Sequence, residues 1–214
     1  MGEMTRHRMV CEQIESRGVS DARVLAAMRR VPRHRFVPHE DRDDAYGDYP
    51  LPIGYSQTIS QPYIVAYMCE LARLSEPDRV LEVGTGSGYN AAVIAQLVDH
   101  TYSVEIVPAL ALRASETVKA LGYDNITIRS GDGYSGWKEA APFDAIIVTA
   151  ATESIPPPLI DQLAEGGRLV IPLGDTFMIQ QLVLVEKRQG QIEATAKLAV
   201  RFVPLTGAHG QHSQ

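Results

Sequence analysis

Apolar residues recur at helical spacing near the start of the 214-residue chain. They lie at 9–14 and again, after Gly18, at 24–28, which is the repeat expected of amphipathic helices. Asp21 is typical of the residue that precedes a helix, and Pro32 cannot continue one. The pattern therefore predicts a helical N-terminal segment that breaks at Gly18 and ends at Pro32.

The stretch 45–62 shows no clear periodicity. It holds three prolines and two glycines, so the sequence predicts neither a helix nor an ordinary strand there. Long loops inside compact proteins are usually functional. We therefore expect this stretch to contribute to a site.

Helical and strand-like patterns alternate beyond residue 62. Helical spacing recurs at 63–74, 91–98 and 109–121. Short apolar runs typical of buried strands lie at 79–84, 101–106, 125–129, 143–149 and 168–171. Strands that alternate with helices predict an α/β fold, in which a doubly wound, mostly parallel sheet carries helices on both faces.

A C-terminal extension of β-strands is predicted after this core. Strand patterns lie at 180–185, 192–196 and 199–203, with the clearest hairpin signal at 187–190. The length suits one buried domain and is too short for two. We expect a single domain, 1–214, made of N-terminal helices and a loop (1–62), a core (63–175), C-terminal strands (176–207) and a polar tail (208–214).

The net charge of −6 argues against a protein that binds nucleic-acid phosphates through its overall charge. Cys11 and Cys69 lack the spacing of a metal site and are expected to be reduced thiols. No stretch resembles a signal peptide, and no apolar run approaches the ~20 residues of a membrane span. We expect a cytoplasmic monomer with no nucleic-acid, membrane or metal partner.

A glycine-rich turn follows the predicted strand at 79–84. Gly84, Gly86 and Gly88 would let the backbone approach a ligand and would present amide groups from the next helix. Their G-x-G-x-G spacing differs from the G-x-G-x-x-G of dinucleotide binders, which disfavours a nicotinamide-dependent dehydrogenase. With Glu82 two residues before Gly84, the turn resembles the first motif of class I methyltransferases. Taken alone, it could also be an ordinary tight turn.

Acidic residues follow the next two predicted strands. Glu105 lies 21 residues after Gly84, where a carboxylate can pair with both hydroxyls of a ribose. Asp132 and Gly133 follow the third strand, where an acidic side chain can accept from an adenine amino group. The alternatives are an exposed strand-end glutamate and an Asx-type turn. Because ligands bind at the carboxyl ends of strands in such sheets, the three features together predict a methyl-donor site.

The segment after the fourth strand of the core bears on the methyl acceptor. Enzymes that methylate base amino groups are expected to carry an Asn/Asp-Pro-Pro-aromatic sequence there. This chain has Thr149, Ala150, Ala151 and Thr152 at that place, and the later prolines at 156–158 lack both the polar lead and the aromatic ring. An ordinary nucleic-acid amino-methyltransferase is therefore disfavoured.

Eight runs resemble the protein-L-isoaspartate O-methyltransferase family, and the resemblance extends from about residue 9 to 207. They lie at 51–54, 57–62, 81–89, 131–133, 141–144, 148–151, 166–172 and 200–205. The runs 57–62 and 200–205 are not general methyltransferase features, so they make the resemblance specific. It implies a Rossmann-like fold and S-adenosylmethionine as the methyl donor. It also implies that the acceptor is the free α-carboxylate of L-isoaspartyl residues in damaged proteins, whose methyl ester cyclises to a succinimide.

The resemblance also implies roles for individual residues. Ser60 corresponds to the active-site serine, Glu105 to the ribose carboxylate and Thr206 to a threonine near donor and acceptor. The donor-binding residues that it implies are Ile53, Gly54, Tyr55, Ser56, Ser60, Glu82, Gly84, Thr85, Gly86, Gly88, Glu105, Ile106, Asp132, Gly133 and Thr206. Ser56 stands where bacterial members usually have glycine, and Asn90 replaces a commoner glutamine.

Ser60 has a second interpretation, because it precedes Pro62 and could cap a helix. A carboxylate acceptor is already ionised near neutral pH and needs no general base, so the expected role of Ser60 is to orient the acceptor. Two other functions remain open. One is a class I methyltransferase for a small-molecule or nucleic-acid acceptor, and the other is a donor-binding module without catalysis, in which Ser56 marks a decayed loop.

Overall fold

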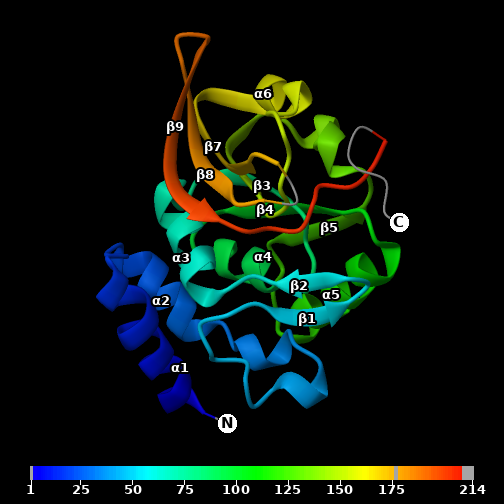
Figure 1. The fold of residues 1–214 in the computed structure, drawn as a ribbon. Coiled ribbons are helices and arrows are strands. Elements are labelled where there is room, and N and C mark those ends of the chain that lie inside the picture. The colour runs from blue at the N-terminus through cyan, green and yellow to red at the C-terminus, as the bar shows by residue number, and fades with distance from the viewer. Residues whose placement is uncertain (1, 176–177, 209–214) are drawn as a thin grey trace.

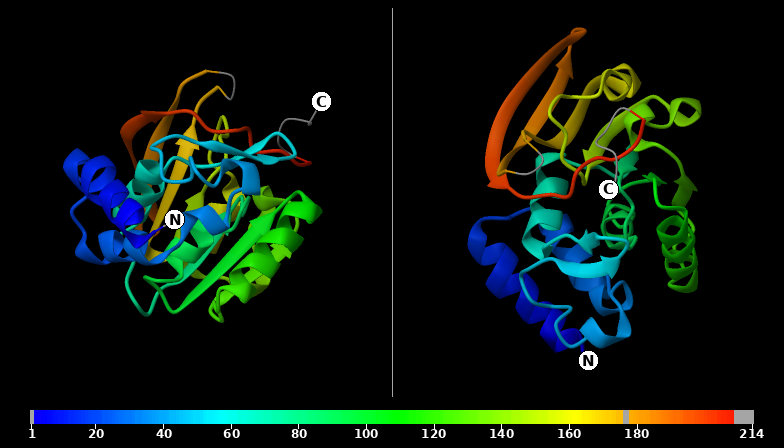
Figure 2. Two further views of the ribbon diagram at one scale, coloured as in Figure 1. Left: turned by 90° about the horizontal axis from the view of Figure 1, so that it is seen from below. Right: turned by 45° about the vertical axis from the view of Figure 1, so that its right-hand side comes forward.

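The computed structural model describes residues 2–175 and 178–208. Within them a seven-stranded sheet carries helices on both faces (Figures 1 and 2). Its strands are β3 (Arg79–Val83), β4 (His100–Glu105), β5 (Ile126–Ser130), β6 (Phe143–Val148), β7 (Leu163–Leu173), β8 (Gln180–Arg188) and β9 (Gln191–Val200). The predicted doubly wound α/β fold with a C-terminal β-extension is confirmed.

The strand order of this sheet is β5-β4-β3-β6-β7-β8-β9. Neighbours from β5 to β7 pair in parallel, whereas β8 pairs antiparallel with both β7 and β9. The direction of winding changes at β3, which has β4 on one side and β6 on the other. Open α/β sheets bind ligands outside the carboxyl ends of the strands at such a switch point. The ends of β3 and β4 are therefore the place to look for the site.

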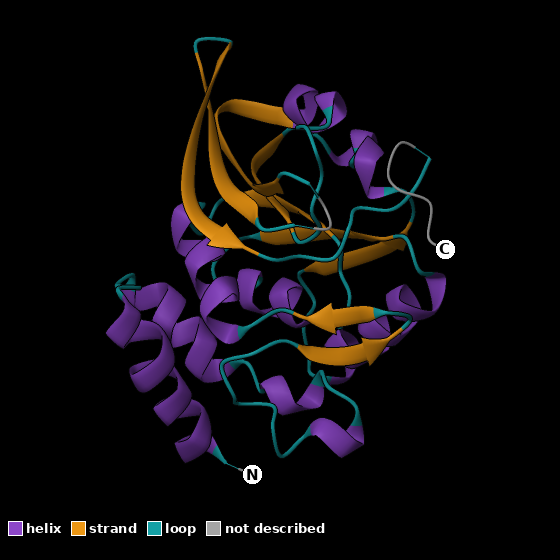
Figure 3. Ribbon diagram, in the orientation of Figure 1, coloured by secondary structure: helices purple, strands orange, loops and turns teal. Residues whose placement is uncertain are grey.

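Short helices surround the sheet, some in contact with it and others packed on neighbouring helices (Figure 3). They are α1 (Glu3–Met9), α2 (Ala22–Arg30), α3 (Pro62–Leu71), α4 (Tyr89–Ile94), α5 (Pro108–Ala120) and α6 (Pro157–Gln162). Helical turns at Val10–Ile14 and Glu15–Arg17 extend α1 as far as Gly18, whose φ of 98° ends the helix. Asp21 caps α2 by accepting from backbone N–H groups of its first turn. The predicted break at Gly18 is confirmed.

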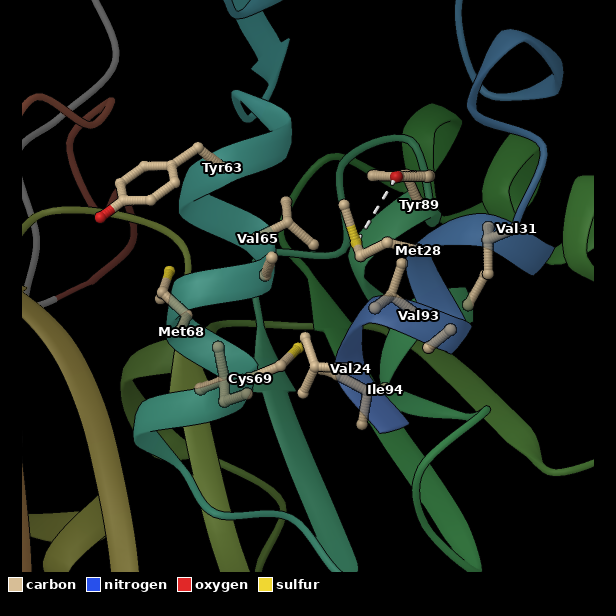
Figure 4. Close-up of a cluster of buried hydrophobic side chains, with 14 of the residues drawn as sticks. Val24, Met28, Val31, Tyr63, Val65, Met68, Cys69, Tyr89, Val93 and Ile94 are labelled. Carbon is tan, nitrogen blue, oxygen red and sulfur yellow. Dashed lines mark hydrogen bonds between the residues drawn. The ribbon is translucent and has the colours of Figure 1, made fainter. Parts of the chain in front are cut away.

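Apolar layers cover both faces of the sheet, because successive strand residues point to opposite sides. Val80 packs in a layer with α2, α3 and α4, and its neighbour Leu81 packs in a layer with α6. In the first layer the Tyr89 hydroxyl donates to Met28 Sδ at 3.8 Å, which joins α4 to α2 (Figure 4). This packing fixes the helix that begins directly after the glycine-rich turn.

The stretch 45–62 contains a small hairpin, so the prediction that it forms no strand was wrong. Its strands are β1 (Leu51–Gly54) and β2 (Gln57–Ile59), joined by a two-residue turn. Pro52 lies in β1, and a two-stranded sheet tolerates its missing N–H donor. Leu51 and Ile53 are buried while Pro52 is exposed, an alternation too short to stand out among prolines and glycines.

The C-terminal prediction is right in kind and wrong in one boundary. The expected hairpin turn between β8 and β9 is confirmed, with Gln189 and Gly190 at φ of 52° and 73°. The strands expected at 192–196 and 199–203 form one strand, β9, which ends at Val200. Beyond it the chain returns to Ala151, whose backbone bonds with Val203 and Leu205. Helix α6 was not anticipated; its prolines lie at the start, where their missing N–H groups cost nothing.

Over 2–175 and 178–208, no helix is long and apolar enough to cross a membrane. Cys11 and Cys69 are free thiols, as expected. In the same part of the chain, no group of three or more His, Cys, Asp or Glu side chains is placed to hold a metal ion. Residues 209–214 of the predicted tail lie outside the described residues.

Candidate active site

A pocket lies at the carboxyl ends of β3 and β4, between the β1–β2 hairpin and the segment that follows β9. It is open to solvent at its mouth, and both polar and apolar residues line it. Residues expected from the sequence to bind donor or acceptor line it: Ser60, Gly84, Thr85, Gly86, Glu105, Ile106, Gly133 and Thr206. The fold thus brings five separate segments of the chain to the switch point of the sheet.

The turn after β3 needs its glycines. Gly84 has a φ of 95°, and a Cβ there would lie 2.3 Å from the hydroxyl of Thr149. That hydroxyl donates to the Gly84 carbonyl at 2.6 Å. Gly86 has a φ of 54°, and a Cβ there would lie 3.3 Å from Ile53 of the hairpin. Since only glycine adopts such angles without strain, the backbone itself forms this wall of the pocket.

Glu105 ends β4 and is buried at the pocket wall. Its carboxylate accepts from the backbone N–H of Gly86 at 2.7 Å and from that of Val107 at 2.9 Å. A carboxylate has about four acceptor sites, so two remain for a ligand. Glu105 therefore holds the glycine-rich turn in place and can still pair with hydroxyl groups of a bound nucleoside.

Glu82 lies beneath the turn in a buried polar network. Asn90 Nδ2 donates to its carboxyl group at 2.7 Å, and the hydroxyl of Ser103 donates to its other oxygen. Ser103 in turn bonds with Thr85 Oγ1 at 2.5 Å. Burial raises the pKa of Glu82 to about 8, against the lowering effect of these hydrogen bonds. Glu82 supports the turn from below, and Thr85 and Asn90 carry the network to the pocket.

Ser60 connects β2 with α3 and lines the pocket. The cap position of α3 is occupied by Gln61, and no side chain caps the helix. The Ser60 hydroxyl has no hydrogen-bond partner among the described residues, so nothing there supports the capping interpretation. It also lines a second, wider groove that adjoins the pocket. Ser60 therefore lies where the donor pocket opens to a larger molecule.

Four of the expected residues, 53–56, lie at the end of β1 and in the turn of the β1–β2 hairpin, outside the pocket lining. Ile53 is buried and supports Gly86 from the hairpin side. Tyr55 and Ser56 form the two-residue turn after Gly54, with φ of 54° and 55°. Such a turn requires positive φ at both central positions and therefore favours Asn or Gly. The chain places Ser56 where glycine is the unstrained residue.

Three further expected residues also lie away from the pocket lining. Glu82 is the buried support described above. Gly88 packs against α5, where a Cβ would lie 3.2 Å from Ala114. The carboxylate of Asp132 accepts from the N–H groups of Tyr134 at 3.0 Å and Ala208 at 2.9 Å. Asp132 thus forms the Asx-type turn considered from the sequence, and Gly133 supplies the pocket surface beside it.

Gln57, Thr58 and Ile59 also line the pocket and belong to the stretch 45–62, which was expected to contribute to a site. Lining residues that were not anticipated from the sequence as site residues include Ser87, Tyr89, Asn90 and Thr149. A signal existed for several of them. Thr149 comes directly after β6 and Glu105 is the last residue of β4, so both lie at the carboxyl ends of strands, where ligands are expected. Asn90 had been noted as a departure from the family pattern, and its Oδ1 is buried without a partner among the described residues.

These features fit an adenosine-containing methyl donor. Exposed backbone at the glycine-rich turn can approach it, and Glu105 retains acceptor capacity for ribose hydroxyls. The unpaired Asn90 Oδ1 can accept a further hydrogen bond from the donor. Buried polar atoms are normally paired, so an unpaired acceptor at a pocket indicates a ligand that donates.

Comparison with known proteins identifies the family. A family model described as protein-L-isoaspartate(D-aspartate) O-methyltransferase matches residues 4–210. This chain belongs to that family. The protein-L-isoaspartate O-methyltransferase of Opitutus terrae is 59% identical over 201 residues, which cover 94% of this chain and 86% of the relative. That of Gloeobacter violaceus is 57% identical over 198 residues, covering 92% and 97%.

A solved structure agrees with this membership. The Plasmodium falciparum protein-L-isoaspartate O-methyltransferase, in complex with S-adenosyl-L-homocysteine, superposes with a TM-score of 0.81 at 29% identity. The match covers 94% of this chain and 98% of that one. The enzyme class, the donor S-adenosylmethionine and the Rossmann-like methyltransferase fold expected from the sequence are confirmed. Protein-L-isoaspartate O-methyltransferases act on isoaspartyl-containing proteins.

Proposed function

We propose that this protein is a repair enzyme in which Ser60 holds the free α-carboxylate of an L-isoaspartyl residue against the methyl donor. The observation that carries the proposal is the junction between the two cavities. Ser60, Thr58 and Thr149 line both the donor pocket and the adjoining groove. A polypeptide in the groove can therefore present a side group to the donor pocket at Ser60.

The chemistry of the pocket suits a carboxylate acceptor. S-adenosylmethionine supplies an electrophilic methyl group, and an ionised carboxylate can accept it without prior loss of a proton. Among the described lining residues Glu105 is the one carboxylate, and there is no His, Lys or Cys to act as a base. Burial raises the pKa of the Tyr89 hydroxyl, so it stays protonated. Apart from Glu105, which is assigned to the donor, the lining residues can position an acceptor but offer no base to deprotonate one.

The work of the chain is then orientation and exclusion of water. Glu105 and the backbone of Gly84 and Gly86 hold the donor, and the hydroxyl of Ser60 donates to the acceptor carboxylate. Thr206 lines the pocket from the segment after β9 and contributes a second hydroxyl. Because Ser60 has no other described partner, its hydroxyl is available for this bond.

The role proposed for the product follows from its chemistry. A methyl ester at the α-carboxylate of isoaspartate is attacked by the next backbone nitrogen and closes to a succinimide with loss of methanol. Hydrolysis of the succinimide returns part of the material to normal aspartate. The enzyme thereby acts on damaged proteins and peptides as repair.

The proposal also covers the location, oligomeric state and partners of the protein. We take the protein to act in the cytoplasm as a monomer of one domain, without nucleic-acid or membrane partners. The free thiols of Cys11 and Cys69 suit a reducing compartment, and the net charge of −6 disfavours polyanionic partners.

The nature of the methylated product tests the proposal. Purified protein would be given labelled donor together with an isoaspartyl peptide, RNA or a mixture of small carboxylic acids. We expect label in the peptide and its release as methanol at alkaline pH, because esters hydrolyse there and N-methyl groups do not. Label in RNA or in a small acid alone would establish another acceptor, and donor binding without transfer would leave a non-catalytic module.

A further inference from the structure

The groove beside the donor pocket has one charged side chain among its described lining residues, Arg201. Arg201 is exposed and forms no hydrogen bond or ion pair with any described residue. Most of the groove is apolar: Pro50, Ile64, Ile179, Ala199, Val200, Phe202, Val203 and Pro204. A lone cation in an apolar groove attracts an anionic group from whatever lies there.

The position of Arg201 relative to the acceptor site can be estimated along the chain. Val203 lines both cavities, and Arg201 precedes it by two residues. Two residues of extended chain span about 7 Å, and the arginine side chain adds several ångströms of reach. An extended peptide whose isoaspartate lies at Ser60 would place residues within about three positions of it near Arg201.

The negative net charge of the protein makes the cation of Arg201 more important for binding an acidic peptide. A net charge of −6 repels acidic peptides in general, so a local cation is needed to accept one. We propose that Arg201 is a specificity-determining residue that favours isoaspartyl peptides with an acidic side chain within about three residues of the isoaspartate. This inference rests on the proposed function, since it assumes a peptide in the groove.

Peptides and enzyme variants that differ in the charge of one residue test this proposal. Isoaspartyl peptides would be identical except for Glu, Gln or Lys at one flanking position, scanned up to three residues on either side. At the most responsive position, we expect kcat/KM to fall about two- to fivefold from Glu to Gln, and again from Gln to Lys, chiefly through KM. Raising the salt concentration should reduce the difference, because an exposed pair is screened.

Variants of the enzyme separate Arg201 from general charge. Arg201→Glu should reverse the order of the three peptides, and Arg201→Gln should flatten it. Lys197→Glu makes the same change in net charge on exposed β9 outside both cavities and should leave the order unaltered. The same order in Arg201→Gln as in the unmodified enzyme, or no order in the unmodified enzyme, would overturn the inference. Failure to methylate any isoaspartyl peptide would instead refute the proposed function.

Discussion

The carboxylate of Asp48 accepts a hydrogen bond from the side-chain amide of Gln61 at 2.7 Å. The same amide donates to the Asp48 carbonyl at 2.9 Å, and the backbone N–H of Tyr63 donates to the carboxylate at 3.2 Å. Arg17 completes the cluster with an ion pair to Asp48 at 2.6 Å and a stacking contact 3.6 Å from the Tyr63 ring. Asp48 therefore fixes the residues that follow Ser60.

Asp48→Ala should lower kcat on an isoaspartyl peptide by about tenfold or more while donor affinity stays nearly unchanged. The reason is positional, since a shift of about 1 Å in an orienting group can cost on the order of a hundredfold in rate. Asp48→Asn keeps an acceptor for the Tyr63 N–H and should be milder. Asp43→Ala, an exposed neighbour, is the control. Steady-state kinetics would measure the loss of kcat, and calorimetry would measure donor affinity. A loss of donor affinity as large as the loss of kcat would contradict the positioning role.

Glu105→Ala should weaken donor binding about ten- to a hundredfold, equivalent to roughly 1.5–3 kcal/mol. It removes acceptors for the ribose and also for the backbone N–H groups of Gly86 and Val107. Glu105→Gln retains one acceptor oxygen, so its affinity for the donor should lie between those of the unmodified protein and Glu105→Ala. Calorimetric titration with S-adenosylmethionine measures the effect. A folded variant with unaltered affinity would remove Glu105 from the donor site.

Ser56→Gly should stabilise the protein by about 0.5–1 kcal/mol, because Ser56 holds a φ of 55° that costs a side-chain-bearing residue free energy. Part of the gain is offset by the greater freedom of glycine in the unfolded chain. Chemical denaturation would compare it with Ser56→Ala, which should not stabilise. Equal stability of the two variants would show that the turn is unstrained.

Glu82 should make the protein less stable as the pH rises from about 5 to 8. Burial raises its pKa from an ordinary value of 4.5 to about 8 in the folded state. Across this window the folded protein keeps a proton that the unfolded chain has lost, so stability is fullest below it and falls by at most about 1.4 kcal/mol per pH unit. In donor-free protein, the pH dependence of unfolding should be flatter in Glu82→Gln. Parallel curves for the two proteins would show that Glu82 does not titrate in this range.

Most of the core of the fold could be predicted because its strands are apolar runs that alternate with helices. The hairpin at 51–59 could not, since its two strands are short and one contains Pro52. The division of β9 into two predicted strands coincides with a register shift, since Leu182 and Val183 of β8 pair with Leu198 and Ala196 and pass over Lys197. The irregular segment after Val200 was wrongly predicted to continue the strand. That segment is held by tertiary bonds to Ala151, which leave no local pattern in the sequence.

The site could be predicted wherever a role follows from a strand end. Gly84, Gly86, Glu105 and Gly133 all lie in the pocket lining. The local bond of Asp132 with the N–H of Tyr134 is the Asx-type turn that the sequence allowed. Its bond with Ala208 and the partners of Glu82 could not be predicted, because only the tertiary fold brings those residues near. The positioning role of Asp48 could not be predicted for the same reason, because its hydrogen bonds to Gln61 and Tyr63 span a loop whose sequence has no regular periodicity.

Two peptides of one sequence, with isoaspartate or aspartate at a single position, test the central claim most directly. In isoaspartate the backbone runs through the side-chain carbonyl, so the free carboxylate sits on a shorter arm and at another angle. If the groove fixes the peptide and Ser60 holds the carboxylate, only one of the two peptides can have its free carboxylate aligned with the methyl group of the donor. We predict methylation of the isoaspartyl peptide at a rate about a hundredfold or more above that of its partner. Comparable rates on the two peptides would contradict the account.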